Sequence, residues 1–139
     1  MSASTAQAKT SASRLASLLL PPLVVMAMIF FLSAQQSDAH HGLFELLLRK
    51  LAHVTEYAVL TLAWWRALRG LGVGTDNRVA IALAVAIALV YSASDELHQT
   101  FVHGRHGTPV DVLIDSIGMT IAAVYALRRS LGPSRPSAA

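Results

Sequence analysis

Cysteine is absent from this 139-residue chain, which excludes disulfide bonds and thiolate metal sites. Charged residues are also scarce: they make up 14% of the sequence, against about 25% in an ordinary soluble domain. Hydrophobic residues, in contrast, account for 54% of the chain, and the mean hydropathy is +0.51. This balance predicts a membrane protein of one compact domain.

The excess of basic residues, a formal net charge of +3, would also suit a nucleic-acid-binding protein. The Lys and Arg residues, however, lie at the ends of apolar segments and do not follow one helix face. We therefore expect no nucleic-acid partner and interpret the charges as signs of membrane topology.

Four apolar segments predict an all-α, polytopic membrane protein with four transmembrane helices in a compact bundle. The first segment has about 20 residues, enough for one helix to cross a hydrocarbon core of about 30 Å. Pro21 and Pro22 should kink this helix or mark its regular start, because proline has no N–H to donate. The helices are expected at about 15–34, 43–69, 78–99 and 109–128.

The two ends of the chain are poor in large apolar residues. Residues 1–13 are mostly Ser, Ala, Thr and Gln and are expected to form a disordered tail, as are residues 130–139. The membrane domain is expected between them, at 14–129. A cleavable signal peptide is the alternative for the first helix, but its apolar region is long and Leu32 fits a cleavage site poorly. An uncleaved helix is favoured.

The distribution of Lys and Arg predicts the orientation. The N-terminal tail, the second loop and the C-terminal end hold eight of them: Lys9, Arg14, Arg66, Arg69, Arg78, Arg128, Arg129 and Arg135. The other side of the predicted bundle holds Arg49, Lys50 and Arg105. The positive-inside rule therefore predicts that both termini are cytoplasmic and that the first and third loops face outward.

A polar stretch, Ser92 to Asp115, separates the last two apolar segments. The polar residues of this stretch recur at helical spacing, so they fall on single faces of the predicted third and fourth helices. Asp95, His98 and Gln99 share a face of the third helix, and Asp111 and Asp115 are one turn apart on the fourth. On the second helix, Lys50, His53 and Glu56 recur at three-residue steps. Ionisable residues at membrane depth are costly and usually functional, so we expect these faces to meet at one site.

The chemistry of this site is open from the residues alone. His53 or His98 could exchange protons beside a carboxylate. A divalent metal could bind His53, Glu56, Asp95, His98 and Asp115, although no HExxH motif is present. Arg105 and Lys50 could bind a phosphate or carboxylate. The structural alternatives are a helix cap for Asp111, after Thr108, and an ion pair of Asp115 with Arg105 or Lys50.

Three stretches in order resemble the VanZ-like family of small bacterial membrane proteins. They are FLSAQ at Phe31–Gln35, KLAHVTEY at Lys50–Tyr57, and SASDELHQTFVHGRHGTPVDVLIDSIG at Ser92–Gly118. The chain departs from the family pattern at His103, where proline is frequent, and at Ala122, where a second glycine is frequent. The family's motif residues correspond to Lys50, His53, Glu56, Tyr57, Asp95, Glu96, His98, Gln99, Gly104, Arg105, Asp111, Asp115 and Gly118.

The resemblance implies a multi-pass protein of the bacterial cytoplasmic (inner) membrane. The family's founding member is associated with low-level resistance to teicoplanin, a glycopeptide antibiotic that acts on lipid-linked cell-wall intermediates outside the membrane. The expected partner is therefore a membrane lipid or a lipid-linked cell-wall intermediate. A second copy of the chain is the other expected partner, because small residues four apart from Ala80 to Ser92 suit dimerisation as well as internal packing.

Three functions are consistent with these observations: binding of an envelope amphiphile, an intramembrane enzyme acting on a lipid-linked substrate, and a non-catalytic interaction protein. The tentative catalytic residues are His53, Glu56, Asp95, Glu96 and His98. The tentative ligand-binding residues are Lys50, Tyr57, Gln99, Arg105, Asp111 and Asp115.

Overall fold

The computed structural model contains four helices in the part of the chain that it describes, residues 2–35, 42–74, 76–105 and 107–131, with side chains from residue 11 onward. They are α1 (Ser2–Ser33), α2 (Leu43–Gly70), α3 (Asn77–Gln99) and α4 (Pro109–Leu131). No strand occurs within these ranges. The all-α, four-helix prediction is confirmed. The predicted first loop, residues 36–41, and residues 132–139 of the predicted C-terminal tail lie outside the described residues.

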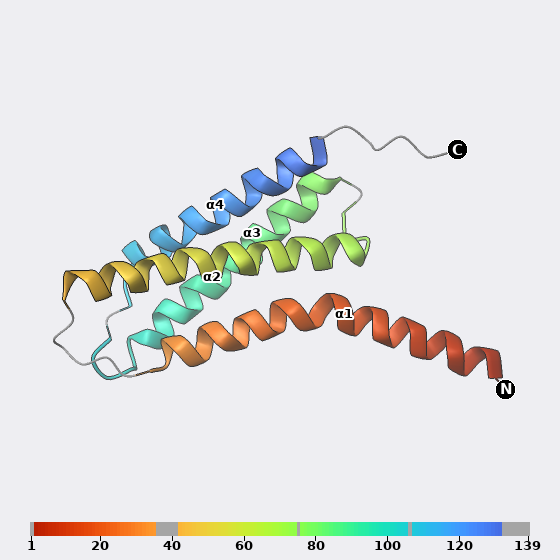
Figure 1. The fold of residues 1–139 in the computed structure, drawn as a ribbon, viewed down its shortest axis with the longest axis horizontal. Helices are drawn as coiled ribbons and strands as arrows, with labels where there is room; N and C mark the ends of the chain where they lie inside the picture. The colour runs from red at the N-terminus through yellow and green to blue at the C-terminus, as the bar shows by residue number, and fades with distance from the viewer. Residues whose placement is uncertain (1, 36–41, 75, 106, 132–139) are drawn as a thin grey trace.

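The start of α1 differs from the prediction. Residues 2–13 continue the helix, where we expected a disordered tail. Alanine recurs in this stretch, and it is the best helix former, so a helix begun in the apolar segment can extend through it. Pro21 and Pro22 lie inside α1, which is bent (Figure 1) as expected for a helix that loses a hydrogen bond at each proline.

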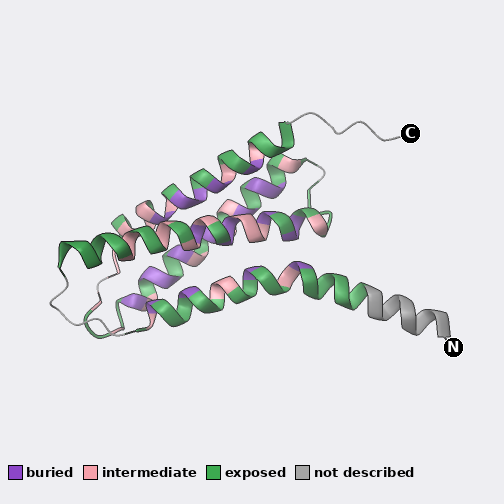
Figure 2. Cartoon of the chain, in the orientation of Figure 1, coloured by how far each residue is buried: buried purple, intermediate pink, exposed green. Residues whose placement is uncertain are grey.

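Three helices are long and apolar enough to cross a membrane: Ser11–Ser33 of α1, Asn77–Gln99 and Pro109–Leu131. α2 carries more charge, yet it lies at the centre of the bundle and contacts each of the other three helices. Figure 2 shows exposed residues along most of α1, among them Leu20, Phe31 and Leu32. Such large apolar side chains on the outside suit a lipid environment.

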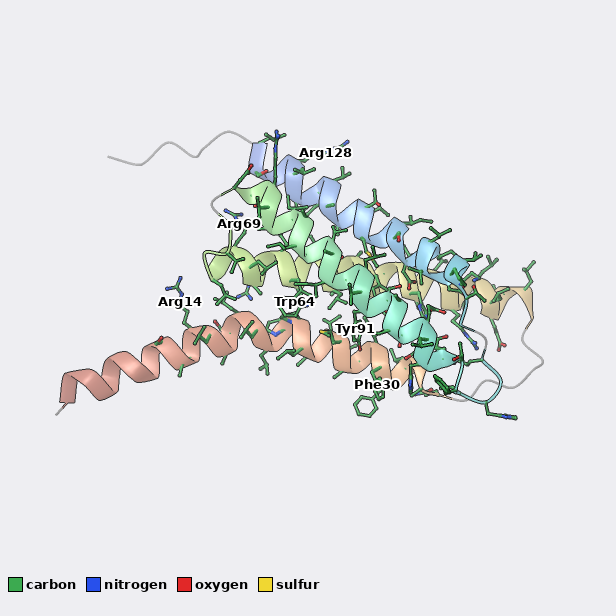
Figure 3. The ribbon with its side chains drawn as sticks, turned by 180° about the vertical axis from the view of Figure 1, so that it is seen from behind. Arg14, Phe30, Trp64, Arg69, Tyr91 and Arg128 are labelled. Carbon is green, nitrogen blue, oxygen red and sulfur yellow. The ribbon has the colours of Figure 1, made fainter. Side chains whose placement is uncertain are left out.

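The bundle has two ends of different character. Figure 1 shows both termini and the α2–α3 connection at one end, and the α1–α2 and α3–α4 connections at the other. In Figure 3, Arg14, Arg69 and Arg128 lie toward the end with the termini, and Phe30 lies toward the opposite end. Three of the basic residues used to predict the orientation, Arg14, Arg69 and Arg128, thus lie toward one end, while the orientation itself stays a prediction.

The core is apolar over most of the bundle. One cluster contains Trp65, Leu68, Ile81 and Ala84, and a second contains Ile29, Tyr57, Leu60 and Met119. Small residues allow close helix contacts. Ala80, Ala84, Ala88 and Ser92 are all buried on α3, and a Cβ added at Gly118 of α4 would lie 2.0 Å from the carbonyl oxygen of Val54 on α2. The small-residue faces therefore pack inside the bundle.

Local signals set the ends of two helices. The Asp76 side chain accepts a 2.9 Å hydrogen bond from the Arg78 N–H and caps α3. At the start of α4, the Asp111 N–H donates to Thr108 Oγ1, and the Thr108 hydroxyl donates to Asp111 Oδ2. The predicted cap at Thr108 is confirmed, with proline at the first helical position. Gly104 turns the α3–α4 connection with a φ of 75°.

Candidate functional site

Buried polar side chains gather where α1 and α3 end and α4 begins. Ser33, Ser92, Asp95, Glu96, Gln99 and Asp115 are each at most 6% exposed. Together with His53 of α2, whose side chain is 14% exposed, we call them the polar cluster. Their hydrogen bonds link α1 to α3 and α3 to α4, so the cluster unites helices that are far apart in sequence. From the predicted polar faces, the structure thus brings together His53, Asp95, Gln99 and Asp115.

Asp115 lies at the centre of the cluster and is fully buried. Its Oδ2 accepts a 2.6 Å hydrogen bond from the Ser92 hydroxyl. Its Oδ1 lies 3.4 Å from His53 Nδ1, longer than a good hydrogen bond, and has no hydrogen-bond partner among the described residues. One oxygen of a buried carboxylate is therefore held in place while the other is unpaired.

Asp95 and Glu96, consecutive on α3, are joined by Gln99 one turn later. The Gln99 amide donates to Asp95 Oδ2 at 3.0 Å and to Glu96 Oε1 at 3.3 Å. Ser33 at the end of α1 donates to Asp95 Oδ1, and the Thr108 N–H donates to Glu96 Oε2 at 3.1 Å. Asp95 thus contacts the end of α1, whereas Glu96 accepts a hydrogen bond from the backbone just before α4.

Lys50 pairs with Asp111 at 2.6 Å, and not with Asp115. The suggested ion pair of Asp115 with Lys50 or Arg105 is thus wrong: within the described residues its only partner of possible opposite charge is His53. The spacing along α4 explains the difference. Asp111 lies at the first turn, where the Lys50 side chain, 35% exposed, reaches it from the rim. Asp115 lies one turn deeper, where its neighbours are Ser92 of α3 and His53 of α2.

Arg105 binds the end of α1. Its Nε donates to the Gln35 carbonyl at 2.9 Å and its Nη2 to the Leu32 carbonyl at 3.0 Å. These carbonyls belong to the last turn of the helix and beyond, where backbone acceptors lack intrahelical partners. Burial, followed by the nearby Arg49 charge, lowers the pKa of the Arg105 guanidinium from its ordinary value. Both Arg105 and Lys50 are therefore already engaged within the chain.

The remaining predicted residues occupy the edges of the cluster. The His98 ring stacks on Phe30 with centroids 4.8 Å apart, and its buried Nε2 has no partner among the described residues. Tyr57 is fully buried between His53 and Tyr91, and its hydroxyl is likewise unpaired there. Glu56 is half-buried and makes no hydrogen bond or ion pair within the described ranges. His40, His41 and His106 lie outside those ranges, and His103 is exposed.

Sequence reasoning missed two serines of the cluster. Ser33 and Ser92 each donate to a buried carboxylate. Ser33 looked like the end of an apolar helix, and Ser92 looked like one more small residue of the alanine ridge. Their positions along the helices could have identified them. Each serine lies at the same depth in the bundle as Asp95 and Asp115, where a buried hydroxyl needs a hydrogen-bond partner.

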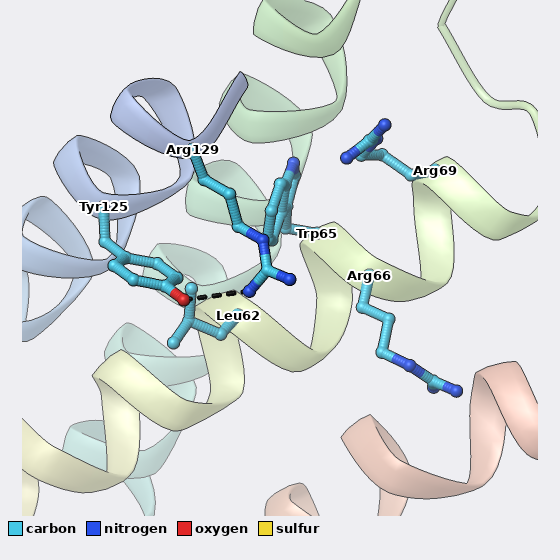
Figure 4. Close-up of a pocket in the computed structure, with 6 residues that line it drawn as sticks. All are labelled: Leu62, Trp65, Arg66, Arg69, Tyr125 and Arg129. Atoms are coloured by element: carbon cyan, nitrogen blue, oxygen red, sulfur yellow. Dashed lines mark hydrogen bonds between the residues drawn. The ribbon is translucent and has the colours of Figure 1, made fainter. Parts of the chain in front are cut away.

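A pocket at the opposite end of the bundle provides a contrast (Figure 4). It is lined by Leu62, Trp65, Arg66, Arg69, Tyr125 and Arg129. Its guanidinium groups do not converge on one point. Arg129 donates to the Tyr125 hydroxyl, Arg66 to the Ser17 carbonyl on α1, and Arg69 lies over the Trp65 ring. We therefore base the functional argument on the polar cluster.

The polar cluster is acidic in its interior. His53, Glu96 and Asp115 each place one metal-ligating atom so that all three atoms lie within 4.8 Å of one another. Neither Lys nor Arg forms a salt bridge with Asp95, Glu96 or Asp115 in the described part of the chain. Such a site can accept hydrogen bonds, exchange a proton through His53, or hold a cation.

Comparison with known proteins identifies the family. The family model described as VanZ/LLP1 matches residues 2–129, which is nearly the whole chain. Neither a curated protein nor a solved structure matches. The match includes all four helices and every described residue of the polar cluster. The chain therefore belongs to the VanZ/LLP1 family.

Proposed function

We propose that this chain is a multi-pass protein of the bacterial cytoplasmic membrane whose polar cluster binds the headgroup of a cell-envelope amphiphile. One observation supports the proposal above all others: buried polar atoms of the cluster and its edges are left without hydrogen bonds. They are Asp115 Oδ1, the Tyr57 hydroxyl and His98 Nε2, which make up three of the five such side-chain atoms in the described residues; the other two, Trp64 Nε1 and Asn77 Nδ2, lie outside the cluster.

A network that only held helices together would be expected to satisfy its own polar groups. Each buried donor or acceptor left unpaired costs about 1–3 kcal/mol, and more if it is charged. Apolar side chains of similar volume would pack the same helices at lower cost. Unpaired atoms in one region are instead what a binding site presents to its ligand. This reasoning favours ligand binding over the non-catalytic interaction protein.

The chemistry of the cluster favours a headgroup rich in hydrogen-bond donors. Lys50 and Arg105 are engaged with Asp111 and with the end of α1, so no described cation of the cluster is free for an anionic group. The carboxylates of Glu96 and Asp115 are acceptors for hydroxyl, amine or amide groups. Sugars and peptides carry such donors, and lipid-linked cell-wall intermediates and teicoplanin contain both. A role in teicoplanin resistance would follow if the protein captured either molecule.

Binding can be tested by native mass spectrometry of the full-length protein in detergent. The protein is incubated separately with lipid-linked cell-wall precursor, with teicoplanin and with phosphatidylglycerol. We expect retention of the precursor or of teicoplanin, and at least about tenfold weaker retention by Asp115→Asn, corresponding to about 1.4 kcal/mol. Asp76→Asn is the control, because it makes the same carboxylate-to-amide change at the α3 cap at the other end of the bundle.

Two results would overturn the proposal: no probe is retained by the unmodified protein, or Asp115→Asn and Asp76→Asn bind equally well. Retention of phosphatidylglycerol alone, unchanged in Asp115→Asn, would likewise move binding away from the polar cluster.

An enzymatic function is the second candidate, and the proximity of His53 to Asp115 favours it. A carboxylate beside an imidazole can orient the ring and stabilise its protonated form during proton transfer. The test is chemical change of the precursor in the same incubation. If turnover occurs and His53→Gln abolishes it while retention persists, the function is catalytic. If the precursor is recovered intact, binding alone remains.

A further inference from the structure

The three groups that approach one another in the polar cluster come from three different helices. His53 is on α2, Glu96 on α3 and Asp115 on α4. Their ligating atoms lie within 4.8 Å of one another, and two of the three side chains are almost completely buried. We propose that these residues form a binding site for a divalent transition-metal ion of the zinc class.

The distance between His53 and Asp115 supports the proposal. Zn²⁺ binds imidazole nitrogen and carboxylate oxygen at about 2.0–2.1 Å, so neighbouring ligands of a tetrahedral site are about 3.3 Å apart. His53 Nδ1 and Asp115 Oδ1 are 3.4 Å apart. This separation is poor for a hydrogen bond but suits two ligands of one ion. Asp115 Oδ1 is fully buried and has no hydrogen bond in the described residues.

Charge also supports a divalent ion. When both are ionised, Glu96 and Asp115 place two negative charges in the bundle, and in the described residues the sole partner of possible positive charge is His53, beside Asp115. A buried charge without a partner is strongly destabilising, and more so among helices surrounded by lipid. One M²⁺ ion bound by two carboxylates and a neutral imidazole would give a site with no net charge.

The neighbours of the triad hold the carboxylates in place as outer-shell groups do in metal sites. Ser92 donates to the second oxygen of Asp115, and the Thr108 N–H and the Gln99 amide donate to Glu96. Gly107 allows the α3–α4 connection to close over Glu96: an added Cβ would lie 1.8 Å from the Glu96 carbonyl oxygen. The His53 side chain is 14% exposed, so the triad is not completely enclosed.

The donor set decides between metal classes. Ca²⁺ takes 6–8 oxygen ligands and Mg²⁺ requires octahedral oxygen coordination, whereas imidazole suits Zn²⁺ and similar ions. Three protein ligands leave a coordination position for water or another molecule, as in sites where zinc acts on a substrate. The structure also changes the predicted ligand set: Glu96 joins His53 and Asp115, whereas the ligating atoms of Glu56, Asp95 and His98 do not come together with them.

The test uses full-length protein in detergent, with any affinity tag removed so that no added histidines bind metal. The protein is stripped with a chelator, loaded with ZnCl₂ and freed of excess ion, and its metal content is measured by elemental mass spectrometry. We expect about one Zn²⁺ per chain. We also expect His53→Gln, Glu96→Gln and Asp115→Asn to lose more than about 100-fold in affinity, since outer-shell changes alone cost about 10–100-fold. Asp76→Asn, at the α3 cap at the other end of the bundle, is the matched control and should retain zinc.

A second pair of variants separates metal binding from folding. Ser92→Ala removes the hydrogen bond to Asp115 and should weaken zinc binding by about 10–100-fold. Ser94→Ala, two residues away, removes a hydroxyl that bonds only the Tyr91 carbonyl and should not change it. The Co²⁺-loaded protein should show the intense visible absorption of a tetrahedral site, and Asp115→Asn should not.

Two outcomes would overturn the proposal. In the first, the unmodified protein retains no stoichiometric zinc. In the second, the triad variants retain as much zinc as Asp76→Asn. This inference goes beyond amphiphile binding and fails separately from it: zinc can be retained when no amphiphile binds, and an amphiphile can be retained by the chelated protein.

Discussion

The Ser92 hydroxyl donates a 2.6 Å hydrogen bond to Asp115 Oδ2, on the neighbouring helix, and leaves Asp115 Oδ1 unpaired. This contact joins α3 to α4 at the depth where their apolar cores end. It fixes the direction in which the free oxygen points, toward His53 on α2. The fold therefore orients a buried carboxylate whose second oxygen is available to a ligand.

The membrane orientation can be tested directly because the chain contains no cysteine. Gly42→Cys, before α2, and Val73→Cys, in the α2–α3 connection, place single thiols at exposed positions near opposite ends of the bundle. The positive-inside rule predicts that a membrane-impermeant maleimide labels Gly42→Cys in intact cells and labels Val73→Cys only after lysis. The reverse pattern would show that the polar cluster faces the cytoplasm.

Close packing of α4 against α2 depends on Gly118. A Cβ at this position would lie 2.0 Å from the backbone oxygen of Val54, which cannot rotate away. We expect Gly118→Ala to destabilise the protein by about 1–3 kcal/mol through overpacking, despite the better helix propensity of alanine. Thermal unfolding in detergent measures the change. Gly42→Ala is the control, since nothing lies within 4 Å of its added Cβ; equal unfolding temperatures for the two variants would disprove the close contact.

Lys50 and Asp111 should behave as a structural pair at the rim. Their side chains are 35% and 24% exposed, so solvent screens their attraction. A double-mutant cycle with Lys50→Met and Asp111→Asn should give a favourable coupling of about 0.2–1 kcal/mol in unfolding free energy. If the two substitutions were additive, the 2.6 Å contact would contribute nothing, and Lys50 would again be a candidate for binding an anionic ligand.

Arg105 should hold the end of α1 against the α3–α4 connection. Arg105→Gln removes the fork that binds the carbonyls of Leu32 and Gln35. We expect faster amide hydrogen exchange at the C-terminal end of α1, with little change around Trp65 in the core of the other end. Exchange that is unchanged at residues 30–35 would show that α1 ends securely without this contact.

The sequence predicted much of this architecture because hydrophobic periodicity and length are local properties. The bounds of α2, α3 and α4 differ from the predicted ones by no more than a few residues, as expected when a helix end is marked by a cap such as Thr108. The start of α1 was misplaced because a stretch of Ala, Ser and Thr without large apolar residues has the same composition whether it forms a helix or a polar tail.

The composition of the site was predictable, whereas its pairing was not. Residue spacing placed His53, Asp95 and Asp115 on faces that could meet, and they are all part of the polar cluster. The partners depend on how the helices cross. Arg105 reaches backbone atoms of α1 some 70 positions earlier, and Lys50 reaches Asp111 in place of Asp115. No local pattern encodes such contacts.

The central claim is that the polar cluster is a binding site and not merely a network that holds the helices together. The most direct measurement is the thermal unfolding of Asp115→Asn beside the unmodified protein, both stripped with chelator and free of added amphiphile. We expect Asp115→Asn to unfold at the same or a higher temperature, because it keeps a partner for Ser92 and removes a buried carboxylate that no described Lys or Arg pairs with. A clear decrease in the unfolding temperature would contradict the account, since Asp115 would then be stabilising the bundle by itself.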